Sequence, residues 1–169
     1  MQRTNWFDRK FSPITDNGLF PTILERLEGT PARLTDKINR MQHNLTLSLN
    51  GKWSIQKEVG HLIDLEPLWR DRALQIIDNQ SNLIAADLTN RKTHETDYDS
   101  MDMAALLAQF SALRSDLMAV LRSATNEDLE KAAIHPRLGT PMKLIDLAYF
   151  VAEHDDHHLA QMTLLSGNN

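Results

Sequence analysis

Apolar residues recur every three to four positions over four long stretches of this chain, and this period limits the fold to packed helices. The clearest stretch carries Met103, Leu106, Leu107, Phe110, Leu113, Leu117, Val120 and Leu121. Similar stripes follow Thr30-Pro31, follow Ser54, and run from Leu144 to Leu165. No stretch sustains the alternation of period two that marks a half-buried strand, so we expect no sheet. The pattern predicts an all-α fold, a single four-helix bundle domain over residues 1–169.

Local signals place the ends of these helices. Ser54 is a good N-cap, and Thr30-Pro31 combines a cap with the residue best tolerated in a first helical turn. Thr140-Pro141 repeats that signal and predicts the start of the last long helix. Before it, the segment from Thr125 to Asp128 predicts a short extra helix that ends ahead of His135-Pro136.

Composition excludes several classes of function. No uncharged apolar run approaches the roughly 18–20 residues that cross a bilayer, and the first residues show no apolar signal core, so we expect a cytoplasmic protein without a membrane partner. The net charge is −5 and the basic residues are scattered, which argues against nucleic acid. There is no cysteine. Any metal must therefore be held by His, Asp or Glu, and thiol chemistry would need a thiol supplied by the substrate.

The last stripe carries two histidines where leucine or valine would face the core. His154 and His158 are four residues apart, so both imidazoles leave the same face of a helix about 6 Å apart. One metal ion can be shared by such a pair at roughly 2 Å from each nitrogen. Two other interpretations stay open, namely buried histidines bonded to backbone or carboxylates, and a solvated helix end, since Asp155, Asp156 and His157 are adjacent.

His61 lies at the border of the stripe that follows Ser54. Alone, it is typical of a satisfied histidine at the edge of a core. With an inward-facing pair from another helix, it would complete three nitrogen ligands of the kind that bundles build from facing helices. Three neutral imidazoles leave a position for water or substrate, as catalytic sites do. Zinc fits this set best, and imidazole also suits nickel and iron.

Two segments of the chain resemble the DinB/YfiT-like family of metal-dependent proteins: Gly51-Lys-Trp-Ser-Ile-Gln-Lys-Glu-Val-Gly-His-Leu62 and Tyr149-Phe-Val-Ala-Glu-His-Asp-Asp-His-His-Leu159. In that family a Trp-Ser opening precedes the first ligand histidine by about two helical turns, and an H-x-x-x-H on the last helix supplies the other two. The matching positions are His61, His154 and His158. The resemblance covers most of the chain, including 24–33 and 135–141, and implies a four-helix bundle with a mononuclear metal site.

The resemblance implies an enzyme that acts on a small molecule. Relatives include thiol-dependent S-transferases and isomerases as well as proteins described as hydrolases. We therefore expect a hydrolase, or an S-transferase with a low-molecular-weight thiol as co-substrate, that uses zinc or nickel. The alternative is a non-catalytic metal-binding bundle protein of the damage or stress response. A diiron site would need two Glu-x-x-His motifs, and Glu58-Val-Gly-His61 is one without a second on the last helix, which argues against it. Exposed bundle faces make a homodimer plausible.

Acidic residues near the histidines have two roles open. Glu153, Asp155, Asp156 and Asp64 are candidates for a general base, but carboxylates beside metal-bound histidines more often orient the imidazoles. Glu66 and Arg70 could line a pocket mouth or be solvated.

The remaining histidines and the long polar connection are less informative. His157 is expected to be a neighbour of the site, whereas His43, His94 and His135 lie outside any ligand spacing and read as surface or loop residues. The segment 86–95 shows no helical spacing. It could cover the metal, with His94 over the mouth and with Arg91 and Lys92 binding an anionic substrate, or it could be a solvated connection.

Overall fold

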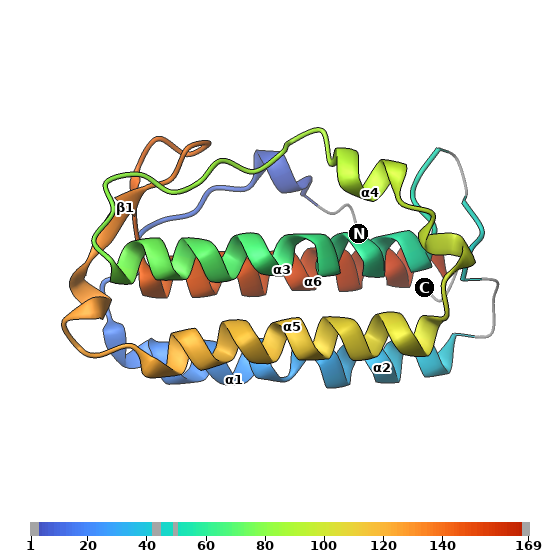
Figure 1. Ribbon diagram of the computed structural model, residues 1–169, viewed down its shortest axis with the longest axis horizontal. Helices are drawn as coiled ribbons and strands as arrows, with labels where there is room; N and C mark the ends of the chain where they lie inside the picture. Colours follow the sequence, from blue (N-terminus) through green and yellow to red (C-terminus); the bar gives the residue numbers. More distant parts are fainter. Residues whose placement is uncertain (1–3, 42–44, 49–50, 167–169) are drawn as a thin grey trace.

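The computed structural model describes residues 4–41, 45–48 and 51–166. It is a bundle of four helical columns, as the sequence predicts (Figure 1). The first column is divided, since one helix follows another end to end with Gly29 between them. The columns are α1 (Phe20–Glu28) with α2 (Thr30–Arg40), α3 (Ile55–Ile77), α5 (Met103–Ser123) and α6 (Leu144–Leu165).

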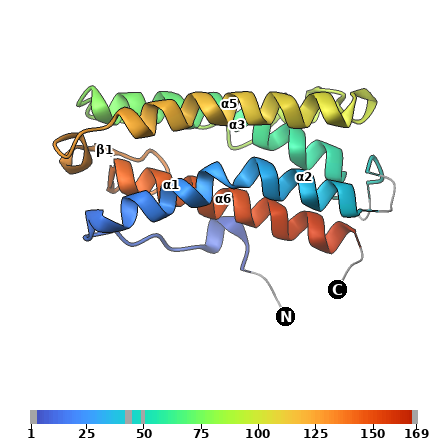
Figure 2. The ribbon, with the colours of Figure 1, turned by 90° about the horizontal axis from the view of Figure 1, so that it is seen from below.

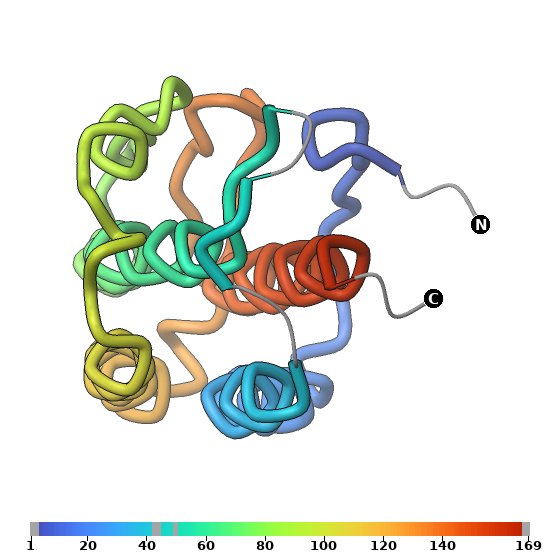
Figure 3. The backbone as a smooth tube through the Cα atoms, turned by 90° about the vertical axis from the view of Figure 1, so that its right-hand side faces the viewer, coloured from blue at the N-terminus to red at the C-terminus, as the bar shows by residue number. Residues whose placement is uncertain are grey.

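The columns do not follow one another around the bundle. α3 packs against α5 and α6, and α1 packs against α6 and α5, so consecutive first and second columns lie diagonally opposite. Viewed end-on in Figure 3, α3 and α6 form one layer, and α5 with the first column forms the other. Figure 2 shows α1 and α2 running along α6. This arrangement brings the Ser54 helix and the two-histidine helix side by side.

Shorter elements lie on the outer side of the α3/α6 layer (Figures 1 and 3). They come from the N-terminal segment, from the connection after α3, and from the hairpin before α6. In chain order all the shorter elements are η1 (Trp6–Asp8), η2 (Asn17–Leu19), α4 (Arg91–Glu95), η3 (Tyr98–Ser100), η4 (Asp128–Glu130), β1 (Ala132–Ile134) and β2 (Pro141–Lys143), where η denotes a 3-10 helix. Of these, η2, η3 and η4 lie at the ends of the columns.

Two expectations about this region are wrong, namely the absence of a sheet and the start of the last helix at Thr140-Pro141. A two-stranded antiparallel sheet exists, with Ile134 opposite Pro141, and its strands of three residues are too short to show alternation. The short extra helix expected before the last long helix is present, as the 3-10 helix η4. Thr140-Pro141 does not start the last helix: Pro141 opens β2, where a missing N–H is tolerated at a strand end, and α6 begins at Leu144. There the Asp146 carboxylate accepts the backbone N–H of Lys143, 3.0 Å away.

Side-chain caps start α3 and α5, and the cap at Ser54 was expected from the sequence. The Ser54 hydroxyl accepts the N–H of Lys57 at the start of α3, and the Asp102 carboxylate accepts the N–H of Ala105 at the start of α5. Each cap satisfies one of the N–H groups that a first helical turn leaves without a partner. By length and composition alone α5 could also cross a membrane, and among the described residues it is the one helix that passes this test. In the bundle it packs against α3, α1 and α2.

The core divides into two apolar clusters with a polar layer between them. One cluster contains Leu27, Trp69, Leu117 and Val151, and the other contains Leu34, Leu62, Phe110 and Leu159. On every column the second set lies about two turns from the first. The gap between them is occupied by charged side chains.

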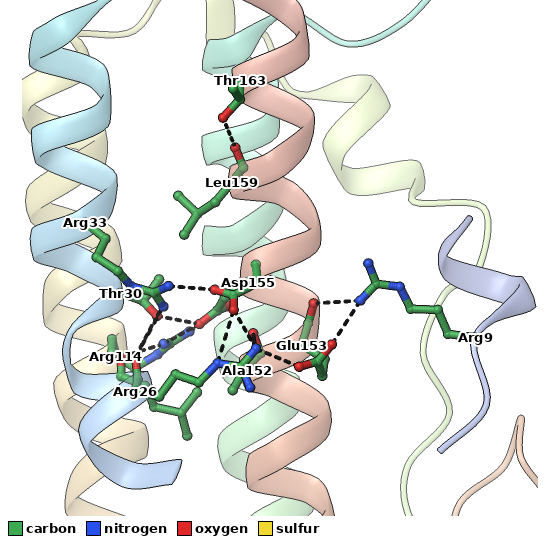
Figure 4. A network of polar contacts seen from close by, with 12 residues as sticks. Arg9, Arg26, Thr30, Arg33, Arg114, Ala152, Glu153, Asp155, Leu159 and Thr163 are labelled. Atoms are coloured by element: carbon green, nitrogen blue, oxygen red, sulfur yellow. Dashed lines mark hydrogen bonds and ion pairs between the residues drawn. The ribbon is translucent and has the colours of Figure 1, made fainter. Parts of the chain in front are cut away.

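Arg114 of α5 lies at the centre of this layer and is 1% exposed. Its guanidinium donates to both oxygens of Glu66 on α3, at 3.1 and 2.6 Å, and to both oxygens of Asp155 on α6, at 2.7 and 3.1 Å. A fifth hydrogen bond, 3.0 Å long, reaches the carbonyl of Leu27 on α1. Thr30 adds a hydrogen bond to Asp155 (Figure 4). One side chain thus connects all four columns.

Replacing Arg114 by alanine should lower the free energy of unfolding by about 3–5 kcal/mol, because two carboxylates would remain buried without their cation. Arg122→Ala on the same helix is the matched control, since its ion pair with Glu28 is half exposed and should contribute less than about 1 kcal/mol. Urea unfolding of both variants measures the difference. Equal losses would show that the buried layer is not a special contributor to stability.

Candidate metal centre

Three histidines from two helices converge in the α3/α6 layer. His61 comes from α3, and His154 and His158 come from successive turns of α6. One ring nitrogen from each lies within 4.8 Å of the others, and all three residues are buried. The Nε2 atoms of His154 and His158 are 3.2 Å apart. The structure therefore brings together the three residues that the sequence singled out.

The polar layer sets the direction in which α6 presents these rings. Asp155 follows His154 directly and is held by Arg114 of α5. Successive helical residues point about 100° apart, so anchoring Asp155 towards α5 turns His154 and His158 towards α3. The orientation of His154 and His158 thus depends on the ion pair between Arg114 and Asp155.

His61 is oriented by a short chain of hydrogen bonds. Its Nδ1 lies 3.2 Å from the Thr93 hydroxyl, and that hydroxyl donates to Asp64 at 2.8 Å. Because the single hydroxyl hydrogen goes to Asp64, the hydroxyl oxygen accepts from His61 Nδ1–H. The Nε2 of the neutral ring then carries the lone pair, which faces the other histidines.

Asp64 is fixed in turn by the connection after α3. The Tyr98 hydroxyl donates to it at 2.6 Å, and the Lys92 ammonium lies 2.9 Å from it. Tyr98 can approach only because residue 60 is glycine: a Cβ at that position would lie 2.3 Å from the tyrosine ring. Among the four predicted acids, Asp64 is therefore the one connected to a ligand-candidate imidazole, through Thr93.

His158 is oriented by a carboxylate that the sequence reading did not assign. Its Nδ1 lies 2.5 Å from Glu58, which is buried one turn before His61 on α3. A hydrogen bond of this kind fixes the ring, leaves Nε2 for a metal and raises the basicity of that nitrogen. The signal was present as Glu58-Val-Gly-His61, since residues three apart share a helix face.

His154 is positioned by aromatic packing. Trp6 and Trp69 meet its ring edge-on, at centroid distances of 5.0 and 5.5 Å. Its Nδ1 is buried without a hydrogen-bond partner among the described residues. Trp6 belongs to the N-terminal segment, whose part in the site carried no signal in the sequence.

Burial keeps the imidazoles neutral. It lowers the pKa of His61 to about 3, with a further lowering from the charge that His158 would carry. Burial, and then the same neighbour, lowers the pKa of His154 well below its usual value. Neutral imidazole is the form that binds metal, so these two rings are available at pH 7 without losing a proton.

The histidines open onto a cavity of about 280 Å³. It lies beneath the covering segments, which are the N-terminal segment, the connection after α3 and the hairpin before α6. Its wall is mostly aromatic and aliphatic, with Trp6, Phe7, Trp53, Leu65, Trp69 and Phe150 among the lining residues. The connection after α3 contributes Ala85 to Leu88 and Asn90, and His157 also lines the cavity, as a neighbour of the site. A cavity of this size admits a small molecule.

The expectation was that acids of α6 orient the imidazoles by direct contact, but Glu153, Asp155 and Asp156 form ion pairs with arginines instead. Glu153 pairs with Arg9 and Arg26, and Asp156 pairs with Arg26 and Arg33. Figure 4 shows Glu153 between Arg9 and Arg26, on the side of α6 that faces the N-terminal segment and α1. Asp155 belongs to the polar layer, so these three carboxylates are structural.

For Glu66 both interpretations, a pocket mouth and a solvated position, are wrong, whereas for Arg70 the solvated position agrees with the structure. Glu66 does not line a pocket mouth, because it is buried against Arg114. Arg70 pairs with its neighbour Asp71 and is not among the residues that line the cavity.

The other histidines divide in a way that the sequence did not indicate. His135 was expected on the surface or in a loop, yet it is buried and lines the cavity, because the hairpin folds it under the covering segments. His94 is exposed as expected and packs edge-on against Trp53. His43 lies outside the described residues.

The polar connection is more ordered than expected. Residues 91–95 form the helix α4, although the sequence showed no helical spacing there. Arg91 is exposed, and Lys92 is paired with Asp64. Of the two interpretations, a covering segment agrees with the structure, since Thr93 contacts His61 and Asp87 to Asn90 lie at the cavity.

Comparison with known proteins agrees with this architecture. A protein of Bacillus licheniformis described as a "Putative metal-dependent hydrolase" is 29% identical over 112 residues, which are 66% of this chain and 64% of that protein. The match therefore spans less than two thirds of that relative. YfiT from Bacillus subtilis, described as "a probable metal-dependent hydrolase with an unusual four-helix bundle topology", superposes with a TM-score of 0.79 at 22% identity, over 94% of this chain and 91% of that one. At that identity the likeness concerns the fold.

The family model of the DinB superfamily matches residues 22–162. That range includes the three clustered histidines and nearly the whole of the four helical columns, from within α1 to within α6. The family resemblance carried by the Trp-Ser and H-x-x-x-H segments is confirmed, and the chain belongs to the DinB superfamily.

Proposed function

We propose that this protein binds one divalent metal ion through His61, His154 and His158 and uses it to transform a small molecule held in the adjoining cavity. The observation that carries the proposal is the convergence of three buried imidazoles at the wall of that cavity. Among the described residues the cluster contains no fourth protein ligand. A structural metal normally saturates its coordination with protein atoms, so three ligands favour a catalytic site.

The donor set fits such an ion. Two nitrogens at about 2.05 Å from a tetrahedral zinc lie roughly 3.3 Å apart, and the Nε2 atoms of His154 and His158 are 3.2 Å apart. His61 and His158 both have Nδ1 engaged, by Thr93 and Glu58, which leaves Nε2 for the metal. Zinc is our first choice and nickel the second, since imidazole suits both.

The chemistry divides between the metal and the protein. A divalent ion bound here supplies Lewis acidity, which activates water or a thiol as the nucleophile. Glu58 and the Thr93–Asp64 pair hold the imidazoles in position. The aromatic wall formed by Trp6, Trp53, Trp69 and Phe150 excludes water and holds the apolar part of a substrate.

Two reactions use this arrangement. Hydrolysis is the activity in the descriptions of the two similar proteins. The positions of the two nearest carboxylates favour thiol transfer. Glu58 is bonded to His158 and Asp64 accepts from Thr93, so neither is available as a base that takes a proton from water. A metal-bound thiol needs less help from a base, since its pKa starts about seven units below that of water. With no cysteine in the chain, the thiol would be a low-molecular-weight co-substrate.

His158→Ala should lower the metal content from about one ion per chain to a small fraction, because two imidazoles alone bind zinc weakly and Glu58 would lose its partner. Atomic emission of the purified protein measures the content. His94→Ala is the matched control, an exposed histidine that should leave the content unchanged. Undiminished metal in His158→Ala would mean that the metal is held elsewhere.

The metal-free protein should lose stability as the pH falls. The unfolded chain binds protons at its histidines below about pH 6.5, whereas folded His61 stays neutral down to about pH 3. The stability that comes from burying a neutral histidine is therefore fully present above pH 6.5. Below pH 6.5 each such histidine lowers the free energy of unfolding by up to about 1.4 kcal/mol per pH unit. Urea unfolding between pH 6.5 and 5, above the range of most carboxylates, measures the slope. His61→Leu should reduce it by about one proton, and an unchanged slope would contradict neutral burial of His61.

Turnover should depend on the loaded metal and discriminate between the two reactions. We expect activity towards electrophilic small molecules that a chelator abolishes and that returning zinc or nickel restores. Turnover only with added low-molecular-weight thiol identifies an S-transferase, and turnover in water alone identifies a hydrolase. Metal binding without turnover under either condition would replace both with a binding role.

A further inference from the structure

The cavity has a basic wall that the proposed metal site does not use. Arg72, His135 and Arg137 line it together with the three histidines. Trp69 separates the two groups: its ring lies against His154 on one side, and the Arg72 guanidinium lies over it at 5.4 Å. The cavity therefore reaches from the candidate metal ligands to a second set of polar groups.

Arg72 is buried without a carboxylate partner among the described residues. Its Nε and one terminal nitrogen donate to the carbonyl of Ile84, at 3.0 and 2.9 Å. The other terminal nitrogen lies 3.1 Å from His135 Nε2. Burial, and then the charge of Arg137, lowers the pKa of Arg72 to about 10, which leaves the guanidinium charged at pH 7.

The hydrogen bonds around His135 cannot all be satisfied. Its Nδ1 lies 3.2 Å from the backbone N–H groups of Arg137 and Leu138, while Nε2 faces the Arg72 guanidinium. Burial, and then Arg72, lowers the pKa of His135 to about 4, so the ring is neutral. A neutral imidazole has one acceptor nitrogen. Whichever nitrogen carries the hydrogen, at least one donor at this ring is left without an acceptor.

Arg137 adds a second unpaired donor. One of its terminal nitrogens is buried and has no hydrogen-bond partner among the described residues. Its guanidinium packs over Phe7 and Phe150, at 5.3 and 5.8 Å from the ring centroids. It also forms no ion pair within the described part of the chain. Buried donors of this kind are costly unless something accepts from them.

The carboxylate that lines the same cavity does not neutralise these arginines. Asp87 is exposed, and its two oxygens accept the N–H and hydroxyl of Thr89 and the N–H of Arg91. The wall therefore presents two guanidiniums and a neutral ring with a shortage of acceptors. A planar anion with two oxygens matches a guanidinium fork.

We propose that Arg137, Arg72 and His135 form a subsite for a carboxylate carried by the small-molecule substrate or co-substrate. The inference rests on the proposed function in that the same cavity holds the reacting molecule. The carboxylate accepts from the unpaired donors, and the apolar part of the molecule lies along Trp69 and Phe150 towards the histidines.

The test compares two probes of one shape, 3-phenylpropionate and 3-phenyl-1-propanol, on the full-length protein at pH 7.5. All three tryptophans of the chain line the cavity, so tryptophan fluorescence reports binding, and calorimetry checks it. The carboxylate should bind about tenfold or more tightly than the alcohol, because hydrogen bonds to a charged group supply at least that factor. In Arg137→Gln the preference should fall to about twofold or less, with binding of the alcohol unchanged.

Controls separate this subsite from the metal and from the fold. Arg70→Gln removes an arginine from the same helix as Arg72 but outside the cavity, and it should keep the full preference. His158→Ala should also keep it, because the carboxylate is not bound through the metal. Circular dichroism confirms that each variant is folded.

Several outcomes would overturn the inference: equal binding of the two probes by the wild type, no binding of either, or a preference that survives Arg137→Gln and disappears in His158→Ala. The last would show that the metal binds the carboxylate. Metal analysis of the same samples tests the proposed function separately. Full metal content without a carboxylate preference overturns the subsite alone, and a preference in protein that binds no metal overturns the metal site alone.

Discussion

The whole bundle depends on one buried guanidinium. Arg114 makes five hydrogen bonds inside the core and connects a carbonyl of α1 with carboxylates of α3 and α6. A buried charge tolerates little displacement, since any shift leaves a carboxylate without its cation in a medium of low polarity. Apolar packing above and below the layer supplies most of the burial, but it does not by itself select one rotation of each helix. The charge layer supplies that selection.

The direction in which α6 presents His154 and His158 follows from this charge layer. Asp155 is held towards α5, so its neighbours His154 and His158 face α3, where His61 and Glu58 are found. The polar residues of α6 therefore have two roles: Asp155 fixes the rotation of the helix, and His154 and His158 are presented as candidate ligands. The same logic explains why Glu153 and Asp156 are far from the imidazoles, although they are close in sequence. They point to other sides of α6, where arginines neutralise them.

Periodicity predicted the fold and placed His154 and His158 on one helix face, because a face can be read from one segment at a time. The choice of His61 as their partner, by contrast, rested on the family resemblance. The sequence also indicated that Asp64 could orient an imidazole, since it lies nearly one helical turn after His61. Other features depend on contacts between distant segments. His135 was expected on the surface or in a loop, and it does lie in the loop of the hairpin, but the fold of the hairpin buries it. Trp6 and Phe7 carry no periodic signal, yet they line the cavity. Residues 91–95 became helical beside Asp64, against their local pattern.

The four helical columns and the covering segments have different roles: the columns contain the charges that hold the helices together, and the covering segments form the cavity. The Arg114 layer lies wholly within the four columns, whereas Trp6, Phe7, residues 85–90 and the hairpin lie over the outer side of α3 and α6. Substitutions in those covering segments change the shape and charge of the cavity without touching the charges that hold the helices. A scaffold of this design would let the cover vary while the helices keep the histidine backbones in place, provided that Thr93 and Trp6, which orient His61 and His154, are retained. The diversity of reactions in such a family would then reside in the cover, and its shared ancestry in the bundle.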